Sequence, residues 1–263
     1  MYNTAKGGEQ LKNYKMIVSY DGTRYFGWEH QPDTEMTIQG KLEKVLSQML
    51  ELPEGQSVTV IGAGRTDAGV HARRQVCSFR AETEKSCGEL LSEIRQYLPE
   101  DIGALSLEEA EPRFHARLSC REKTYVYRIW NSAQPDVFGR RYRTAWPGAL
   151  DEAAMRRAAA LLIGEHDFSA FCTARGKKKS AVRTIKNIEL RRDGEELRLV
   201  FSGDGFLYNM VRILTGTLLE VGSGRRSAES VGEALVSLNR AQAGFTAPPQ
   251  GLFLWEVRYD GEN

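Results

Sequence analysis

The sequence lacks the features that mark several classes of protein. No apolar run approaches the roughly 18 residues that span a bilayer, which excludes an integral membrane protein. Residues 1–13 are polar and have no apolar centre of the kind found in a signal peptide. We expect these residues to form a short flexible arm, and we expect a cytoplasmic protein with no membrane partner.

Cysteine and histidine are scarce, with four residues of each. The histidines stand apart and the cysteines include no C-x-x-C pair, so the sequence predicts no metal site. In a chain without a secretion signal, the cysteines are expected to be reduced thiols that mostly fill the core. They are Cys77, Cys87, Cys120 and Cys172.

Net charge is also nearly absent, because 36 Lys and Arg residues face 35 Asp and Glu residues and leave +1. This balance excludes a general polycation, but the charges are segregated along the chain. Residues 81–111 hold nine acids and two bases, 113–143 eight bases and two acids, and 171–192 eight bases and one acid. Solvated surface faces can produce such runs. Two basic runs near one candidate site favour a polyanionic partner.

Hydrophobic periodicity divides the chain into two halves that repeat the order β-α-β-β-α-β. In the first half the predicted strands are 15–20, 57–61, 75–80 and 102–107, and the predicted helices are 38–49 and a segment capped by Ser86 and stopped by Pro99. In the second half the predicted strands are 125–130, 188–190, 197–201 and 252–259, and the predicted helices are 155–163, 210–221 and 228–238. Asp193-Gly194 is a strong hairpin signal between two of these strands.

This order predicts an α+β fold made of two ferredoxin-like halves, with antiparallel sheets that carry their helices on one face. The opposite faces would stay open for binding. We expect domains at residues 14–112 and 113–263, following the arm at residues 1–13. The alternative is an unrelated α+β fold.

The segment from Ser57 to Gly64 is similar to the start of a dinucleotide-binding fingerprint, but its continuation excludes that function. Asp67 occupies the place of the third glycine, where its carboxylate would meet a pyrophosphate. The residues that follow, as far as Ala72, have no helical periodicity, so no helix N-terminus is available for phosphate. We therefore expect no nucleotide cofactor. Asp67 either caps a turn or, beside Arg65, offers a carboxylate to a polyanionic ligand.

The nine residues Gly64–Ala72, which read GRTDAGVHA, resemble the specific motif of the tRNA pseudouridine synthase A (TruA) family. The resemblance extends along almost the whole chain. Further matching segments are Tyr20–Trp28, Thr37–Glu43, Phe114–Arg117, Lys123–Tyr127, Gly205–Arg212 and Gly251–Leu254.

The resemblance implies an isomerase that converts uridine to pseudouridine in the anticodon stem-loop of tRNA, at positions 38, 39 and 40. It implies a homodimer without cofactor or metal, and an RNA-binding cleft between the two halves. It places the catalytic nucleophile at Asp67 and the substrate-binding tyrosine at Tyr125. Without the resemblance, Tyr125 would be read as a core aromatic residue.

Two arginines complete the predicted catalytic group. Arg65 is a candidate for base flipping, since a guanidinium plane can stack in the place of the extruded base. Arg212 lies on a helix that is apolar on two faces, so it is expected to be buried with a carboxylate partner, and the resemblance suggests Asp67. The alternative is a surface arginine that reaches solvent. The predicted RNA-binding residues are Phe114, His115, Ala116, Arg117, Leu118, Arg175, Gly176, Lys177, Lys178 and Lys179.

Two positions depart from the pattern of the family. Arg74 stands where the family commonly has Gly, and Glu29 stands where a Gln often follows the Trp. A paralogue that modifies another RNA or fewer positions is therefore an alternative. A non-catalytic RNA-binding module is a second alternative, although such a module gains nothing from a carboxylate beside RNA. A glycoside hydrolase would normally need two carboxylates, and only Asp67 is evident in a motif.

Overall fold

The computed structural model describes residues 11–173 and 180–261, which form two compact units. Unit 1 runs as far as Cys120 and takes in the end of the chain from Tyr259, whereas unit 2 comprises Arg121–Arg258. The predicted boundary between 14–112 and 113–263 follows the sequence repeat and stays a prediction. The predicted arm is residues 1–13, of which residues 1–10 lie outside the described residues. Residues 12 and 13 already belong to the first strand.

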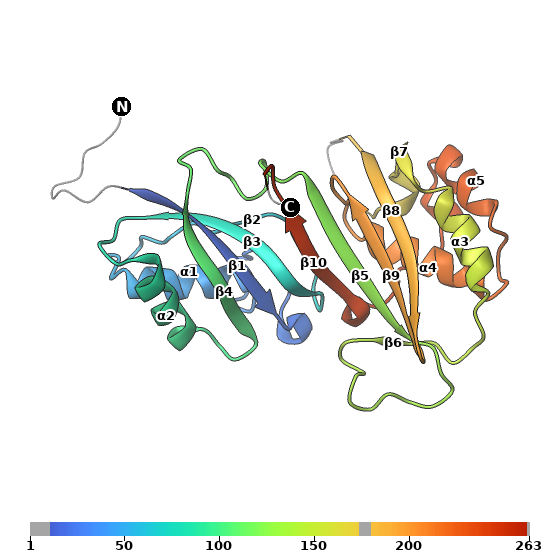
Figure 1. The fold of residues 1–263 in the computed structure, drawn as a ribbon, viewed down its shortest axis with the longest axis horizontal. Helices are drawn as coiled ribbons and strands as arrows, with labels where there is room; N and C mark the ends of the chain where they lie inside the picture. Colours follow the sequence, from blue (N-terminus) through green and yellow to red (C-terminus); the bar gives the residue numbers. More distant parts are fainter. Residues whose placement is uncertain (1–10, 174–179, 262–263) are drawn as a thin grey trace. The chain divides into compact units, whose positions relative to one another are not determined.

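Unit 1 contains one β-α-β-β-α-β sequence of elements (Figure 1). They are β1 (Lys12–Tyr20), α1 (Ile38–Met49), β2 (Ile61–Gly62), β3 (His71–Ala81), α2 (Cys87–Tyr97) and β4 (Ile102–Ala110), with a 3-10 turn at Gly22–Arg24 after β1. The strand order is β4-β1-β3, and β2 pairs with the side of β3 that faces away from β1. Each of these pairs is antiparallel. This order and direction are those of a ferredoxin-like unit.

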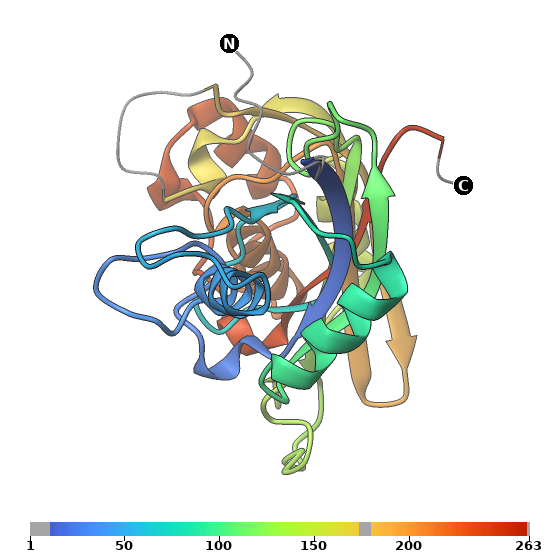
Figure 2. The same cartoon turned by 90° about the vertical axis from the view of Figure 1, so that its left-hand side faces the viewer.

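The two helices of unit 1 begin at capping residues and pack on each other (Figure 2). Thr37 accepts a hydrogen bond from the Gly40 amide and starts α1. Ser86 and Glu89 form a capping box at the start of α2, which confirms the predicted cap. Since α1 contacts α2 and α2 packs on β4, both helices lie on one face of the sheet.

Unit 2 repeats the same topology with additions at its edges. Its elements are β5 (Glu122–Trp130), β6 (Thr144–Ala145), α3 (Glu152–Ala160), β7 (Gly164–Asp167), β8 (Val182–Asp193), β9 (Glu196–Gly203), α4 (Met210–Gly222), α5 (Ser230–Ser237) and β10 (Leu252–Arg258), with 3-10 turns at Ser169–Phe171, Arg240–Gln242 and Pro249–Gly251. The strand order β10-β5-β9-β8-β7 places the four main strands as in unit 1. Helix α3 packs on α4 and on β8, and α4 packs on β5, so these helices share one face of the sheet. The predicted α+β fold with ferredoxin-like halves is confirmed.

The predicted strand at residues 57–61 is wrong except at its last residue. Its alternating Val58 and Val60 are buried as expected, but their amides donate to the side chains of α1 and not to a neighbouring strand. Val58 N donates to Ser47 Oγ at 3.0 Å, and Val60 N donates to Glu43 Oε1 at 3.0 Å. The hairpin at Asp193-Gly194 is confirmed, and Gly194 adopts a φ of +54° there. Helix α3 begins at Glu152 because Asp151 caps it, three residues before the predicted start.

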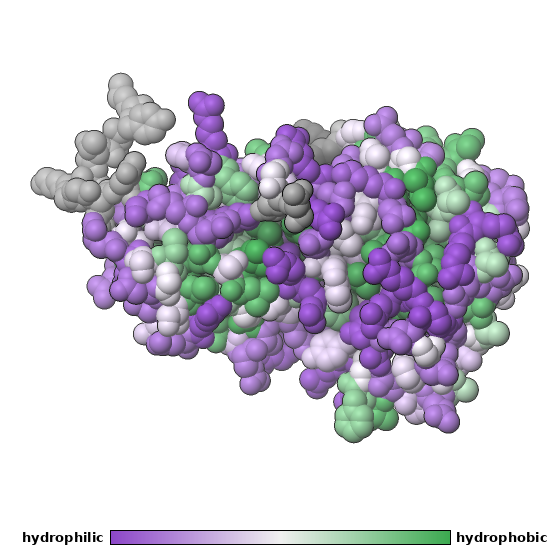
Figure 3. Space-filling view, viewed as in Figure 1, coloured by the Kyte–Doolittle hydropathy of each residue, from purple (hydrophilic) through white to green (hydrophobic). Residues whose placement is uncertain are grey.

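Of the cysteines, only Cys77 is buried, so the expectation that they mostly fill the core is wrong for the other three. No disulfide joins the four. Within the described ranges, no helix is long and apolar enough to cross a membrane. The tip of the loop between β5 and β6 is hydrophobic (Figure 3), because Val137 and Phe138 are exposed there, the latter at 95%.

Candidate active site

Asp67 lies in a tight loop of unit 1 that connects β2 to β3. The amide of Val70 donates to the Asp67 carbonyl oxygen at 3.1 Å, which closes the turn, and Gly69 adopts a φ of +76°. Thr66 before it is buried, Ala68 after it is exposed, and Asp67 itself is half-buried. The loop therefore brings a carboxylate to the border between core and solvent, where a ligand can reach it.

Arg65 is an exposed residue of the same loop and forms an ion pair with Glu29. Arg117 lies close to the same pair. Burial lowers the pKa of Arg117, the Arg65 charge lowers it further, and Glu29 acts in the opposite direction. Two guanidinium charges thus lie near a single carboxylate, that of Glu29, which leaves an excess of positive charge on this surface of unit 1. Such an arrangement favours a phosphate-bearing ligand.

Residues 114–118 form a turn that the fold holds firmly in unit 1. The Phe114 ring packs on the Tyr259 ring with their centroids 5.0 Å apart. His115 Nδ1 accepts hydrogen bonds from the amides of Arg117 and Leu118, each at 3.2 Å, so this histidine orders the turn. Ala116 is fully buried, whereas Leu118 is exposed at 77%.

Tyr125 lies on β5 in unit 2 and is buried, with 7% of its surface exposed. Its ring meets the Phe206 ring edge-on, with the centroids 5.2 Å apart. Across the sheet it stands opposite Phe201 of β9 and Leu254 of β10. The ring is therefore held by aromatic and aliphatic neighbours on several sides.

Arg212 lies in the first turn of α4, whose other residues except Glu220 are buried. This confirms the buried helix inferred from the sequence, whereas Arg212 itself is half-buried and not fully buried as expected. Arg212 Nε donates to the Ala247 carbonyl oxygen at 2.7 Å, and Nη1 donates to Asn209 Oδ1 at 2.8 Å. Its guanidinium group is therefore oriented by two acceptors within unit 2.

The predicted site residues thus fall into three groups. Arg65, Asp67 and the turn 114–118 belong to unit 1, whereas Tyr125 and Arg212 belong to unit 2. The remaining predictions, Arg175, Gly176, Lys177, Lys178 and Lys179, lie outside the described residues.

Sequence reasoning missed the residues that hold these groups in place. Asn209 orients Arg212, and its left-handed backbone just before a helix is a conformation that asparagine tolerates better than most residues. Tyr20 and Gln75 contact the backbone and side chains of the Asp67 loop through hydrogen bonds, described below. No local periodicity marks contacts between residues so far apart in the sequence.

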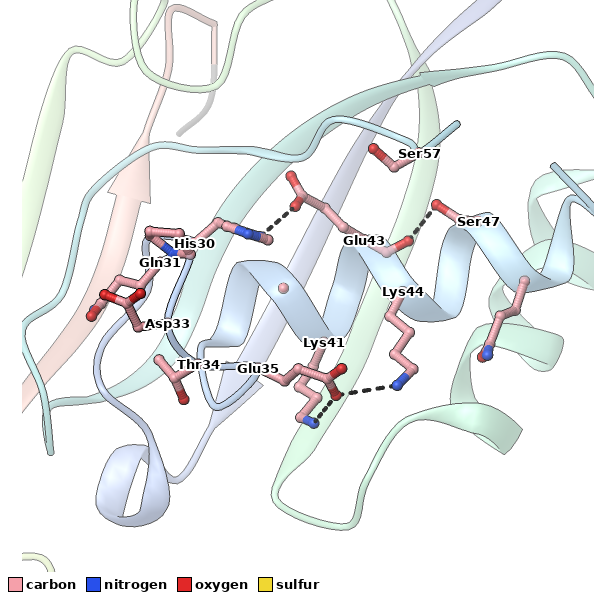
Figure 4. A pocket seen from close by; sticks show the side chains of 13 residues that line it. His30, Gln31, Asp33, Thr34, Glu35, Lys41, Glu43, Lys44, Ser47 and Ser57 are labelled. Carbon is pink, nitrogen blue, oxygen red and sulfur yellow. Dashed lines mark hydrogen bonds and ion pairs between the residues drawn. The ribbon is translucent and has the colours of Figure 1, made fainter. Parts of the chain in front are cut away.

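A separate pocket of about 560 Å³ lies beside α1 in unit 1 (Figure 4). The His30 side chain points toward Glu43 on one side of it, and Glu35 lies beside Lys41 and Lys44 on the other. Among the described residues, none that the sequence predicts to be catalytic or RNA-binding lines this pocket.

Comparison with known proteins identifies the family. Residues 16–118 and 158–260, which include Asp67 and Arg212, match the tRNA pseudouridine synthases. The chain belongs to this family. Members of the family are isomerases that act on uridine in tRNA, and membership assigns this reaction to the chain.

Several relatives match over nearly their whole length. The tRNA pseudouridine synthase A of Geobacillus sp. strain WCH70 is 45% identical over 249 residues, which are 95% of this chain and 99% of that protein. The tRNA pseudouridine synthase A of Listeria innocua serovar 6a is 44% identical over 252 residues, which are 95% of this chain and 100% of that protein. Among solved structures, a Cbf5-Nop10-Gar1 complex gives a TM-score of 0.35 at 13% identity, covering 92% of this chain and 48% of that one.

Proposed function

We propose that this tRNA pseudouridine synthase acts on the anticodon stem-loop, at positions 38, 39 and 40, with Asp67 as its catalytic nucleophile. The observation that carries the proposal is the loop at residues 64–70, which brings a half-buried carboxylate next to the exposed cation of Arg65. A carboxylate that approaches RNA needs such cations, because the phosphates would otherwise repel it. Family membership supplies the reaction.

The reaction breaks the N1–C1′ bond of uridine, turns the uracil and forms a C5–C1′ bond. The hydrogen on C5 leaves as a proton and N1 gains one, so the product is an isomer of the substrate. The Asp67 carboxylate serves as nucleophile toward the sugar or the base, or as a base at the start of the reaction. Each of these routes needs its oxygen within reach of the extruded nucleoside.

Arg65 and Tyr125 act on the target base in this proposal. Extrusion of the base costs a few kcal/mol of stacking, and Arg65 fills the vacated place with its planar guanidinium group. Arg65 has to leave Glu29 to do so. Tyr125 stacks on the extruded uracil, and its packing against Phe206 fixes the plane of the ring.

Arg212 is the proposed ion-pair partner of Asp67. A guanidinium group beside the carboxylate keeps it ionised and fixes its orientation. Arg212 is suited to this role because Asn209 and the Ala247 carbonyl oxygen orient its guanidinium group, and a guanidinium group carries five N–H donors in a planar fork that suits a carboxylate.

The tRNA backbone is bound by the turn at Phe114, His115, Ala116, Arg117 and Leu118 and by the basic run at 175–179. Within the turn, Arg117 supplies the charge, Leu118 supplies an exposed apolar contact, and the buried Ala116 holds the backbone in place. The basic run is rich in lysine and tracks phosphates without reading the sequence.

The proposal includes a homodimer, and the exposed tip of the loop after β5 is a surface that self-association would cover. Sedimentation velocity over a range of protein concentrations tests this. We expect a dimer that the substitution Phe138→Ser weakens. A monomer at all concentrations would contradict this part of the proposal.

The central experiment uses unmodified tRNA labelled with tritium at C5 of uracil. The intact protein is expected to release the label, and Asp67→Ala is expected to abolish release while binding the tRNA within about twofold of the intact protein. Asp33→Asn removes an exposed carboxylate elsewhere in unit 1 and serves as the matched control.

Each other outcome supports a different function. Tight tRNA binding by the intact protein without release would support a non-catalytic binding module. Release at positions other than 38, 39 and 40, mapped by chemical modification and primer extension, would support a paralogue with another target. Activity retained by Asp67→Ala would reject the role of Asp67.

A further inference from the structure

The Asp67 loop is fastened to the segment between β1 and α1. Trp28 N donates to the Thr66 carbonyl oxygen at 3.0 Å, and Gly69 N donates to the Tyr25 carbonyl oxygen at 3.2 Å. The two segments approach so closely that a Cβ atom on Gly27, whose φ is +102°, would lie 2.7 Å from the Thr66 carbonyl oxygen. The backbone of the loop is therefore supported on both sides of Asp67.

The start of the loop is held by a buried side chain of β3. Gln75 is fully buried, and its Nε2 donates to the Gly64 carbonyl oxygen at 2.7 Å while its Oε1 accepts from the Gly64 amide at 3.3 Å. The Gln75 side-chain amide thus both donates a hydrogen bond to the Gly64 backbone and accepts one from it. Arg74, the neighbouring departure from the family pattern, is exposed and leaves this contact intact.

Thr66, the residue directly before Asp67, is also held through its side chain. The Tyr20 hydroxyl and Thr66 Oγ1 are 2.8 Å apart, and both residues are buried, with 5% and 6% of their surfaces exposed. Burial raises the pKa of the Tyr20 phenol, and hydrogen bonds with Thr66 and Gln75 act in the opposite direction. The phenol therefore stays protonated and remains able to donate a hydrogen bond throughout the working pH range.

We propose that Tyr20 and Thr66 are positioning residues, whose hydroxyl pair fixes the direction of the Asp67 carboxylate for reaction. This inference rests on the role proposed above for Asp67. The loop begins at Gly64 and contains Gly69, so its backbone depends on these contacts to restrict its freedom, and the hydroxyl pair is the one that holds a side chain directly before Asp67. A displacement of about 1 Å at a reacting group can cost about 100-fold in rate, and a single buried hydrogen bond can prevent such a displacement.

A purely structural role for this hydrogen bond predicts a different outcome. Loss of a buried hydroxyl pair would then lower the free energy of unfolding and leave the chemistry of the folded fraction unchanged. A positioning role instead lowers the rate of the chemical step at saturating tRNA, where every enzyme molecule is folded and bound.

The test compares Tyr20→Phe, Thr66→Val, the double variant and Thr66→Ser in single-turnover reactions with saturating tRNA. We expect each of the first two to slow the reaction about 10- to 100-fold with a tRNA Kd within about twofold of the intact protein. The double variant should be no slower than the slower single variant, since each substitution already breaks the contact between Tyr20 and Thr66. Thr66→Ser keeps the hydroxyl and should restore most of the rate.

Thr217→Val is the matched control, because Thr217 is a fully buried threonine of unit 2 whose hydroxyl accepts from the Gly244 amide at 2.9 Å. It should lower stability without a comparable loss of rate. Rates of Tyr20→Phe and Thr66→Val that match that of Thr217→Val, or losses that add in the double variant, would overturn the inference. Asp67→Ala separates the two proposals: if it is inactive while Tyr20→Phe is fully active, the role of Asp67 stands and the positioning role fails.

Discussion

Asn209 accepts a hydrogen bond from Arg212 at 2.8 Å across the first turn of α4, and it does so from a left-handed backbone with a φ of +59°. Its side-chain amide also donates to Thr173 Oγ1 at 2.8 Å. A left-handed conformation costs most residues about 1 kcal/mol or more. In this conformation one side chain both orients Arg212 and contacts Thr173, which follows the 3-10 turn at Ser169–Phe171.

Two substitutions of Asn209 distinguish the contribution of its left-handed backbone from that of its side-chain hydrogen bonds. Asn209→Gly keeps the left-handed conformation and loses the acceptor, whereas Asn209→Ala loses both. We expect both variants to slow single-turnover pseudouridine formation about tenfold, because Arg212 loses the acceptor at Asn209 Oδ1 that orients its guanidinium group. Both variants should also lower the free energy of unfolding, because each loses the side-chain hydrogen bonds to Arg212 and Thr173, and Asn209→Ala should lower it by about 1 kcal/mol more through the strained left-handed backbone. A normal rate in Asn209→Gly would show that Asn209 has only a structural role.

The ion pair between Glu29 and Arg65 leads to a prediction about tRNA binding. Because the pair is exposed, it is worth about 1 kcal/mol or less, which corresponds to about fivefold in affinity. Glu29→Gln frees Arg65 for phosphate, so it should tighten tRNA binding up to about fivefold at low salt and steepen the salt dependence. The measurement is a binding titration in the Asp67→Ala background, where no turnover occurs.

Glu35→Gln is the control for this prediction. It removes a carboxylate that pairs with Lys41 and Lys44 in the same unit, so it changes the net charge equally. An equal gain in affinity from both substitutions would mean that only the total charge matters and that Glu29 does not restrain Arg65.

The topology could be predicted from the sequence because it depends on short-range signals. Apolar spacing located α1, and the Ser86 cap and the Asp193-Gly194 turn marked element ends through local hydrogen bonds and backbone preferences. Prediction failed at Val58 and Val60, where an alternating pattern reflects burial and not strand pairing. Their amides find partners in the side chains of α1, and no pattern of residues 57–61 encodes that choice.

Only those residues of the candidate site that belong to a recognisable sequence pattern could be predicted. The residues GRTDAGVHA located Asp67 and Arg65, and the pattern of α4 showed that Arg212 stands in a buried helix. The contacts that hold these groups are long-range: Tyr20 and Thr66 are 46 residues apart in the chain. Tyr259, at the end of the chain, likewise packs in unit 1, because its hydroxyl donates to the Ala116 carbonyl oxygen. Such pairs appear only once the chain has folded.

Glu196 gives a prediction about stability and pH. Burial raises the pKa of its carboxyl, but hydrogen bonds from Arg128 and Arg198 and the charge of Arg143 outweigh burial and lower the pKa to about 2. A lowered pKa in the folded state stabilises the protein above the pKa of the unfolded chain, about 4.5, and this stabilisation is lost as pH falls toward 2. Glu196→Gln should therefore lower the free energy of unfolding by about 2–3 kcal/mol near pH 7.

Urea unfolding between pH 7 and pH 3 measures this effect. The difference in the free energy of unfolding between Glu196→Gln and the intact protein should be constant above about pH 5 and should become smaller below it. Glu189→Gln is the control. It removes an exposed ion pair between Glu189 and Arg191, both on β8 next to β9, and should change the free energy of unfolding by less than about 0.5 kcal/mol. If the loss in free energy of unfolding caused by Glu196→Gln does not depend on pH, the carboxylate charge is not what stabilises the fold.

The near-zero net charge makes the basic run at 175–179 the strongest test of how tRNA is bound. If binding relies on a local patch, replacing Lys177, Lys178 and Lys179 with alanine should weaken binding and lower the slope of log K against log salt concentration by about 2–3. Replacing Lys12, Lys41 and Lys44 removes the same total charge from unit 1, where these lysines pair with Glu35 and Glu109. This control should change the slope by less than about 1, because paired lysines release few counterions from the RNA. Equal slopes for the two triple variants would mean that tRNA responds to the total charge of the protein, and the patch would then have no special role.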